Sequence, residues 1–389
     1  MYSKKDVKRI SILISVCVLI IVFLFLFLVS VGVYSYLIKS DNFNIVKALT
    51  KYNSILELYN NNYISDFDKE NALEMAIDYA IAGVVESTSD KYGYYIPASE
   101  ASVTGSRIIT GDYEGLGLGL IYNEDNTIEI ITVIENSPAG YVDVQVGDKI
   151  TKINQMPVTK DVYQNFADSL KRKVINSVYF EINGVREVYI EVGPVISEKI
   201  KVDIVDNIGY ISIYNFVPDT VELFKNAIDL LVDNNVDKII FDLRDNSGGN
   251  ADVVVEMLDY IVKDDLIVEC DYTHREAQII MADSFSKLSE NISIYLVVNG
   301  NTASASELFV MTLQDLRNAV VIGQTTYGKS TVLSLFSLRD DSILCMSVGT
   351  YYSKSHRNIE GIGIEPDIYL DDSEVLLELK DISFLYSLS

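Results

Sequence analysis

The N-terminus contains 29 consecutive residues without a charge, from Ile10 to Ile38. At a rise of about 1.5 Å per residue, roughly 20 helical residues already cross a hydrocarbon layer of about 30 Å. Residues 4–9 before this stretch carry four basic side chains and one acidic one, and basic flanks stay in the cytoplasm. We therefore expect residues 1–40 to be a cytoplasmic stub and a transmembrane anchor, and the remainder to lie outside the cytoplasm.

A cleaved signal peptide is the alternative to this anchor. The apolar run is longer than the central region of most signal peptides, and Val33-Tyr34-Ser35 matches a cleavage site poorly. The sequence thus favours a single-pass protein of the cell membrane with a cytoplasmic N-terminus.

Charge and composition exclude several classes of protein. Acidic residues outnumber basic ones 56 to 31, so we expect no nucleic-acid partner. The two histidines are too few for a histidine-rich metal site, and the cysteines Cys17, Cys270 and Cys345 form no disulfide framework or metal motif. We expect neither a metal nor a cofactor, while a bridge between Cys270 and Cys345 stays open.

The pattern of apolar residues divides the exterior part into three regions. Residues 41–111 show helical spacing. Residues 112–196 contain short β runs and one helix at 160–172, separated by Gly, Asn and Pro. Residues 197–389 alternate strands and helices and end in a predicted hairpin at 331–352. The expected fold is therefore a multidomain α/β protein, with a transmembrane helix and a small helical region ahead of a β domain and an α/β core.

The segment Asn299-Gly-Asn-Thr-Ala-Ser-Ala-Ser-Glu-Leu308 follows an apolar strand and opens a helix. A serine in such a turn can protrude beside the free N–H groups of the helix end, so Ser304 is a candidate nucleophile. The alternative is ordinary helix capping, in which Ser304 and Glu307 form a capping box.

Lys329 lies in Gly323-Gln-Thr-Thr-Tyr-Gly-Lys-Ser330, which also follows a strand. Poor solvation in such a turn lowers the pKa of a lysine and lets it act as a base. A solvated loop lysine is the alternative. A third segment, Asp242-Leu-Arg-Asp-Asn-Ser-Gly-Gly249, ends a strand, and the N–H groups of Gly248 and Gly249 suit an oxyanion.

In this order, DLRDNSGG, NTASASELF, GQTTYGKS and GTYYSKSHRNIEGIGIEPDI resemble the sequence blocks of the carboxyl-terminal processing (tail-specific) serine peptidases. The resemblance covers nearly the whole chain and implies a PDZ domain followed by a protease core of crotonase-like architecture. It implies that Ser304 is the nucleophile and Lys329 the general base, with an oxyanion hole formed by Ala305 and by Gly248 or Gly249.

The chain departs from this family at two positions next to the lysine. Leu333 stands where members usually carry a glutamine that orients the amine, so a catalytically impaired scaffold that only binds peptides is an alternative function. Ser330 follows the lysine where glycine is common, and its hydroxyl is a hypothetical substitute for the missing amide.

The PDZ interpretation rests on Tyr113-Glu-Gly-Leu-Gly-Leu-Gly-Leu120 and on the later Asn136-Ser-Pro-Ala-Gly140. A glycine-rich loop of this kind binds a C-terminal carboxylate through backbone N–H groups, and the peptide adds a strand to the sheet. The predicted peptide-binding residues are Gly115, Leu116, Gly117 and Leu118. The repeated glycines also suggest a dinucleotide-binding loop, but such a loop needs a different glycine spacing and a helix after it, and a strand is expected here.

Gly323 to Ser330 also matches the phosphate-binding P-loop pattern, and Ile239 to Asp242 resembles a Walker B strand. A strand is expected after Ser330, however, where a P-loop needs a helix. The favoured function is a membrane-anchored serine endopeptidase that cleaves proteins near apolar C-termini. The sequence does not determine the substrate, and it leaves homo-oligomer formation open.

Overall fold

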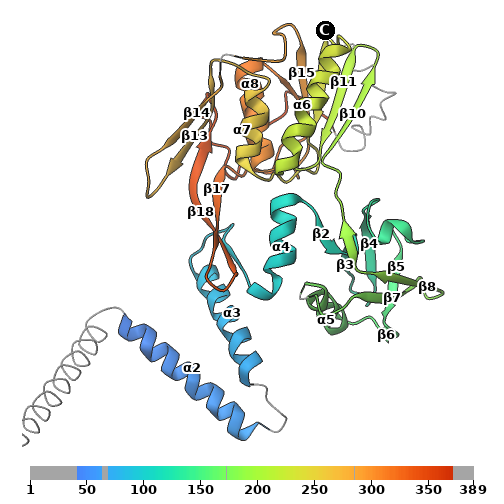
Figure 1. Cartoon of the computed structure of the whole chain (residues 1–389), viewed down its shortest axis with the longest axis vertical. Coiled ribbons are helices and arrows are strands. Elements are labelled where there is room, and N and C mark those ends of the chain that lie inside the picture. The colour runs from blue at the N-terminus through green and yellow to red at the C-terminus, as the bar shows by residue number, and fades with distance from the viewer. Residues whose placement is uncertain (1–41, 64–68, 172, 284, 371–389) are drawn as a thin grey trace, which may run out of the picture. The chain divides into compact units, whose positions relative to one another are not determined.

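The computed structural model describes residues 42–63, 69–171, 173–283 and 285–370. The membrane span expected at Ile10–Ile38 lies outside these ranges, and none of the helices within them is long and apolar enough to cross a membrane. The chain divides into two compact units, residues 1–81 and 82–389 (Figure 1).

The helices expected in residues 41–111 are present. They are α2 (Asn42–Asn62), α3 (Lys69–Ser87) and α4 (Ala98–Thr110). One short strand, β1 (Tyr94–Ile96), interrupts this helical region and was not predicted. It pairs with a strand from the far end of the chain.

The β-rich middle region forms a six-stranded antiparallel sheet with its own apolar core. Its strands are β3 (Leu118–Tyr122), β4 (Ile128–Val133), β5 (Lys149–Ile153), β6 (Met156–Pro157), β7 (Ser177–Ile182) and β8 (Arg186–Glu191). The predicted helix is α5 (Lys160–Lys171). Strand β3 lies at one edge of the sheet, and the short pair β2 (Tyr113–Gly115) and β9 (Gly193–Val195) precedes and follows the sheet along the chain.

The C-terminal region is built on a second six-stranded sheet in the order β10-β11-β12-β15-β16-β19. Its strands are β10 (Ile200–Val205), β11 (Ile208–Ile213), β12 (Lys238–Asp242), β15 (Ser293–Val298), β16 (Val320–Gly323) and β19 (Ile368–Tyr369). All neighbours except β10 and β11 are parallel. The apolar run in β12 follows from its central place, since inner parallel strands are covered on both faces.

Three helices, α6 (Pro218–Asp233), α7 (Ala251–Asp259) and α8 (Ala305–Arg317), lie on one face of this sheet (Figure 1). Their core contains a cluster of four buried phenylalanines, in which Phe241 and Phe309 meet edge to face at 5.3 Å. Because the strands are parallel, β12, β15 and β16 all end at the same edge of the sheet. The segments 243–250, 299–304 and 324–330 therefore meet there, where open α/β sheets collect their sites.

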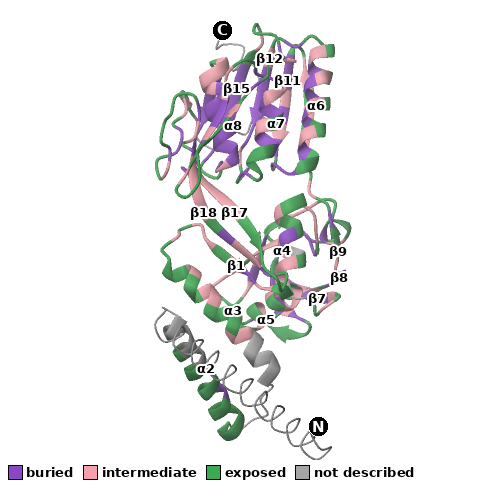
Figure 2. Cartoon of the chain, turned by 60° about the vertical axis from the view of Figure 1, so that its left-hand side comes forward, coloured by how far each residue is buried: buried purple, intermediate pink, exposed green. Residues whose placement is uncertain are grey.

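A third sheet in the order β1-β18-β13-β14 packs beside this core, with β17 paired to β18. It contains the predicted hairpin β17 (Thr331–Ser337) and β18 (Ile343–Tyr352), and also β13 (Leu266–Tyr272) and β14 (Gln278–Met281), which were not predicted. In Figure 2, β1 lies beside the half of this hairpin that is next to its turn, in agreement with its pairing to the first residues of β18. Cys270 and Cys345 are buried free thiols, so the bridge left open by the sequence does not form.

Candidate active site

Ser304 lies in the sharp turn between β15 and α8. Its φ and ψ angles are 59° and −121°, a region that costs a residue with a side chain roughly 1–3 kcal/mol. Strained turns of this kind, between a strand and a helix, expose the side chain of a nucleophile. The Glu307 carboxylate accepts a hydrogen bond from the Ser304 N–H at 2.9 Å. The carboxylate half of the expected capping box is thus present, and it stabilises the strained turn.

The glycine loop after β12 lies directly against this turn. A Cβ atom on Gly248 would stand 3.0 Å from the Cβ of Ser304 and 2.8 Å from the carbonyl oxygen of Ala303. The φ angle of Gly248 is 106°, in the region that favours glycine. Both facts require glycine at this position, and they bring the loop within contact of the candidate nucleophile.

The three candidate oxyanion donors, the N–H groups of Gly248, Gly249 and Ala305, differ in whether they already donate a hydrogen bond. The Gly248 N–H donates to the side-chain oxygen of Asn246 at 2.9 Å. Within residues 42–370 as far as they are described, the N–H groups of Gly249 and Ala305 have no acceptor. The geometry therefore leaves Gly249 and Ala305 available to bind an oxyanion, while the N–H of Gly248 is engaged.

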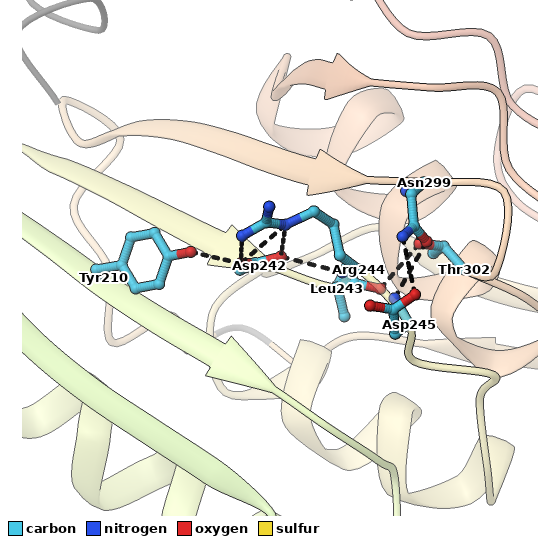
Figure 3. Close-up of polar contacts among 7 residues, drawn as sticks. All are labelled: Tyr210, Asp242, Leu243, Arg244, Asp245, Asn299 and Thr302. Atoms are coloured by element: carbon cyan, nitrogen blue, oxygen red, sulfur yellow. Dashed lines mark hydrogen bonds and ion pairs between the residues drawn. The ribbon is translucent and has the colours of Figure 1, made fainter. Parts of the chain in front are cut away.

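Polar side chains join the loop after β12 to the turn after β15 (Figure 3). The Asp245 N–H donates to Asn299 Oδ1 at 3.1 Å, and Asn299 Nδ2 donates to Asp245 Oδ1 at 2.9 Å. Thr302, fully buried, donates to the carbonyl oxygen of Leu243 at 2.8 Å. Hydrogen bonds from Asn301 and Asn299 lower the pKa of the Asp245 carboxyl. These contacts fix the glycine loop and the serine turn relative to each other.

Glu307 also binds the loop that carries Lys329. Its carboxylate has no exposed surface, and it accepts hydrogen bonds from the N–H groups of Gly328 at 2.7 Å and Lys329 at 2.8 Å, and from Thr326 Oγ1 at 2.5 Å. One buried carboxylate thus ties the backbone of Ser304 to that of Lys329.

Tyr351 makes a second connection between the same two residues. Its hydroxyl lies 2.6 Å from the carbonyl oxygen of Ser304 and 2.7 Å from that of Lys329, and it can donate its single proton to either. The side chain is buried, and burial raises the pKa of its hydroxyl well above the ordinary value. Tyr351 therefore remains a protonated donor between the two candidate catalytic residues.

The Lys329 amine lies over the ring of Tyr92, with Nζ 4.5 Å from the ring centroid. Burial lowers the pKa of this amine below its ordinary value of 10.5, against the attraction of nearby Glu360 and Glu307. In the part of the chain that the structure describes, no hydrogen bond joins this amine to the Ser304 hydroxyl. The site therefore contains a partly buried lysine whose amine contacts an aromatic ring.

Neither Leu333 nor Ser330, the two positions that depart from the family, offers a hydrogen bond to the Lys329 amine. Leu333 lies on β17 opposite Ser347 of β18 and has an apolar side chain. The Ser330 hydroxyl donates to Glu360 at 3.4 Å. The orienting role considered for Ser330 therefore has no contact to support it.

The P-loop alternative fails on two features of the lysine loop. The loop leads into strand β17 and not into a helix. The N–H groups of Gly328 and Lys329, which a P-loop would direct at phosphate, already donate to Glu307. The Asp242 carboxylate, considered as a Walker B residue, is occupied by Arg244 at 2.6 Å and by the Tyr210 hydroxyl (Figure 3).

Four residues of the site escaped a functional interpretation from the sequence. Glu307 was visible only as a helix cap. Tyr351 and Glu360 lie within the last family block but were given no role there. Tyr92 gave no signal, because it reaches the site through a contact between distant segments; the Tyr92 hydroxyl and Glu360 are separated by 268 positions.

The predicted peptide-binding residues lie at the start of the antiparallel sheet. Gly117 has a φ angle of 80°, and a Cβ there would overlap the hydroxyl of Ser137. The carbonyl groups of Leu116 and Gly117 accept hydrogen bonds from Ala139 and from Ile134. Leu118 opens β3, whose other edge carries no further strand among the described residues. A strained glycine loop beside an edge strand suits strand addition by a peptide.

A serine on a strained strand-to-helix turn, with unpaired N–H groups and a partly buried lysine nearby, has the arrangement of a serine hydrolase. Comparison with known proteins gives the family. Residues 207–370 match the model of Peptidase family S41, and residues 107–175 match that of the PDZ domain. Residues 207–370 therefore form a region that matches the S41 peptidases, and a region that matches the PDZ domain precedes it.

Two named relatives support this assignment. A "Carboxy-terminal-processing protease" of Bartonella bacilliformis is 26% identical over 84% of this chain and 76% of its own length. A "Probable CtpA-like serine protease" of Staphylococcus haemolyticus is 28% identical over 86% of this chain and 66% of its own length. The chain thus spans about two thirds to three quarters of these relatives.

The fold agrees with a solved structure of the same kind. The "Photosystem II D1 C-terminal processing protease" aligns with 84% of this chain and 93% of its own, with a TM-score of 0.53 at 18% identity. The expected combination of a PDZ domain and a peptidase core is therefore confirmed, as is the resemblance to carboxyl-terminal processing peptidases.

Proposed function

We propose that this chain is an endopeptidase in which Ser304 is the nucleophile and Lys329 the general base, and that it cleaves proteins near their C-termini. The observation that carries the proposal is the double connection through Glu307 and Tyr351. Each side chain binds the backbone of both residues, although 25 positions separate them in the chain. Helix capping by Glu307 would require its bond to Ser304 alone, and would not require the loop that carries Lys329 to bind the same carboxylate.

In the proposed reaction, the neutral Lys329 amine takes the proton of the Ser304 hydroxyl as its oxygen attacks a peptide carbonyl. The N–H groups of Gly249 and Ala305 stabilise the resulting oxyanion. The ammonium of Lys329 then gives its proton to the leaving amine, and an acyl-enzyme remains. A water molecule, deprotonated by the same amine, hydrolyses the ester and restores the serine.

The resting position of the lysine is compatible with this reaction. Lysine has a flexible four-carbon side chain, and catalytic hydrogen bonds are often long before a substrate binds. The reaction also requires a neutral amine. Burial lowers the pKa of the Lys329 amine and so increases its neutral fraction.

We assign recognition of the substrate tail to the PDZ domain. The loop from Gly115 to Leu118 would bind the C-terminal carboxylate through its backbone, and the tail would extend along β3. Apolar tails are expected because the adjoining core is apolar; Leu116 itself is buried.

Membrane anchoring is part of the same proposal. It rests on the uncharged stretch from Ile10 to Ile38 and its basic flank. The protease then acts on the outer side of the cell membrane. In intact cells, an externally added protease should degrade the catalytic region, and protection of that region would contradict the orientation.

The test uses an unstructured peptide with an apolar C-terminus as substrate. Ser304→Ala and Lys329→Ala should each abolish cleavage while thermal unfolding stays unchanged. Exposed Ser289 and Lys263 provide matched controls, and Ser289→Ala and Lys263→Ala should leave turnover intact. A fluorophosphonate probe should label Ser304 alone. Turnover in either active-site variant would reject the dyad.

A peptide-binding scaffold without turnover is the second candidate, favoured by the apolar Leu333 and by the lack of a hydrogen bond between Ser304 and Lys329. Under this alternative, the chain binds the apolar tail but neither cleaves it nor reacts with the probe. Leu333→Gln separates the two functions further, because a supplied amide should raise turnover by about 3-fold or more if the orientation of the amine limits the rate.

A further inference from the structure

The contact between Lys329 and Tyr92 identifies a residue that positions the base. We propose that the ring of Tyr92 is the support that holds the Lys329 amine at one place in the site and out of water. This inference rests on the proposed Ser-Lys reaction, and it adds a residue from a part of the chain far from the four family blocks. The amine lies 4.5 Å from the ring centroid, within the range of a cation–π contact.

The ring is fixed by the same carboxylate that fixes the backbone after the lysine. The Tyr92 hydroxyl donates to Glu360 Oε1 at 2.8 Å. The other oxygen of Glu360 accepts the Ser330 N–H at 2.9 Å and the Thr331 hydroxyl at 3.1 Å. One carboxylate therefore holds both the ring and the backbone that directly follows the lysine, while the lysine side chain keeps its own freedom.

The segment that carries the ring is itself anchored on the hairpin that follows Lys329. Asp90 accepts hydrogen bonds from the N–H of Ser347 at 2.8 Å and from its hydroxyl at 2.6 Å. Strand β1 then pairs with β18, with Tyr94 opposite Cys345. Tyr92 lies between these two attachments, so the turn presents its ring to the lysine in a defined place.

The surroundings of the amine determine which effect of the ring matters most. The charged or titratable groups near it are Glu360, Glu307, Lys91 and the buried Cys345 thiol. Burial is the main influence on the pKa of Lys329, and it lowers that pKa. A ring that covers the amine contributes to this burial. Its removal should therefore hydrate the amine and raise the pKa, although the loss of the cation–π contact acts in the opposite direction.

Two substitutions distinguish the contribution of the Tyr92 ring from that of its hydroxyl. Tyr92→Phe keeps the ring and loses the bond to Glu360, so kcat should stay within about 5-fold of the unmodified protein. Tyr92→Ala removes the ring, so kcat should fall by about 10-fold or more with little change in KM. The acid limb of the pH profile should also move to higher pH in Tyr92→Ala. Tyr369→Ala, an exposed tyrosine on β19, is the matched control and should behave as the unmodified protein.

A purely structural role of Tyr92 gives a different pattern. If the residue only fastened its segment to Glu360, Tyr92→Phe and Tyr92→Ala would be equally impaired and neither would shift the pH profile. That result overturns the proposal, as does full activity in Tyr92→Ala with an unchanged profile. Thermal unfolding of each variant shows whether a loss of activity reflects a loss of fold.

A measurement that does not depend on catalysis tests the role of Tyr92 separately from the proposed function. The rate at which Lys329 is acetylated can be followed by mass spectrometry over a range of pH in the full chain. The pH of half-maximal labelling should be higher in Tyr92→Ala than in the unmodified protein and unchanged in Tyr92→Phe. Equal values in all three proteins overturn the role of the ring. A shifted value in a chain that cleaves nothing supports the contact and rejects the dyad.

Discussion

The two halves of the site are built in different ways. The serine half, residues 242–250 and 299–307, consists of two consecutive connections of one parallel sheet, and its contacts join neighbouring strand ends. The lysine half, residues 323–330, depends on Tyr92, Tyr351 and Glu360, which come from distant segments. The proposed nucleophile is therefore placed by the sheet itself, whereas the proposed base is placed by contacts with distant segments.

This difference predicts how each half responds to mutation. Changes in the serine half should alter the oxyanion contacts and leave the lysine unchanged. Changes in the lysine half should alter the pKa and position of the amine and leave the turn at Ser304 intact. Glu307 belongs to both halves, so its replacement should affect both.

Glu307→Ala should have the largest effect. It leaves the N–H groups of Ser304, Gly328 and Lys329 and the hydroxyl of Thr326 without their buried acceptor, and an unsatisfied buried group costs about 1–3 kcal/mol. We expect the free energy of unfolding to fall by about 4 kcal/mol or more, and cleavage to be lost. Urea unfolding measures the first effect. Glu124→Ala, at an exposed position, is the control and should change stability by less than about 0.5 kcal/mol. Unchanged stability in Glu307→Ala would show that the two halves are held together by other contacts.

Gly249→Ala should damage the serine half alone. The φ angle of Gly249 is 145°, and an added Cβ would stand 2.3 Å from the carbonyl oxygen of Phe216. We expect a loss of about 2 kcal/mol or more in stability and a marked fall in kcat. The acetylation profile of Lys329 should stay the same. Gly147→Ala is the matched control, because it has a φ angle of 90° but open space around the added atom. Equal losses in both variants would attribute the effect to φ and not to the crowded loop.

Tyr351→Phe should have a moderate effect on both residues of the dyad. The change removes only the hydroxyl between the carbonyl oxygens of Ser304 and Lys329, and a lost hydrogen bond costs about 1 kcal/mol. We expect kcat to fall by about 10-fold with a nearly unchanged KM. Steady-state kinetics measure this, and unaltered kcat would mean that Glu307 and the backbone hydrogen bond from Tyr327 to Thr302 suffice to align the halves.

The pH dependence of the unmodified protein should show a displaced acid limb. In the proposed reaction only the neutral Lys329 amine accepts the serine proton, so activity should rise as pH increases through the pKa of the amine. Burial lowers that pKa, and the midpoint of the limb should therefore lie below 10.5. A profile of kcat against pH tests this. A midpoint at or above 10.5 would mean that the lysine is fully solvated.

The contrast between the halves also explains what could be predicted from the sequence. The short β runs of residues 112–196, the helix at 160–172 and the hairpin at 331–352 were predicted, because alternating and helical spacings of apolar residues are local patterns. Strands β13 and β14 were missed, since their apolar residues alternate weakly. The same applies to the site. The turn at Ser304 was recognisable from its small residues, whereas the ring of Tyr92 under Lys329 had no local signal.

One consequence of the Tyr351 and Glu360 contacts concerns the order in which the chain is made. Ribosomes synthesise Ser304, Glu307 and Lys329 before Tyr351 and Glu360. A nascent or truncated protein that ends before residue 351 therefore contains the Glu307 carboxylate but lacks the hydroxyl of Tyr351 and the carboxylate of Glu360, which also bind the lysine loop. Complete positioning of that loop requires the chain to extend through residue 360.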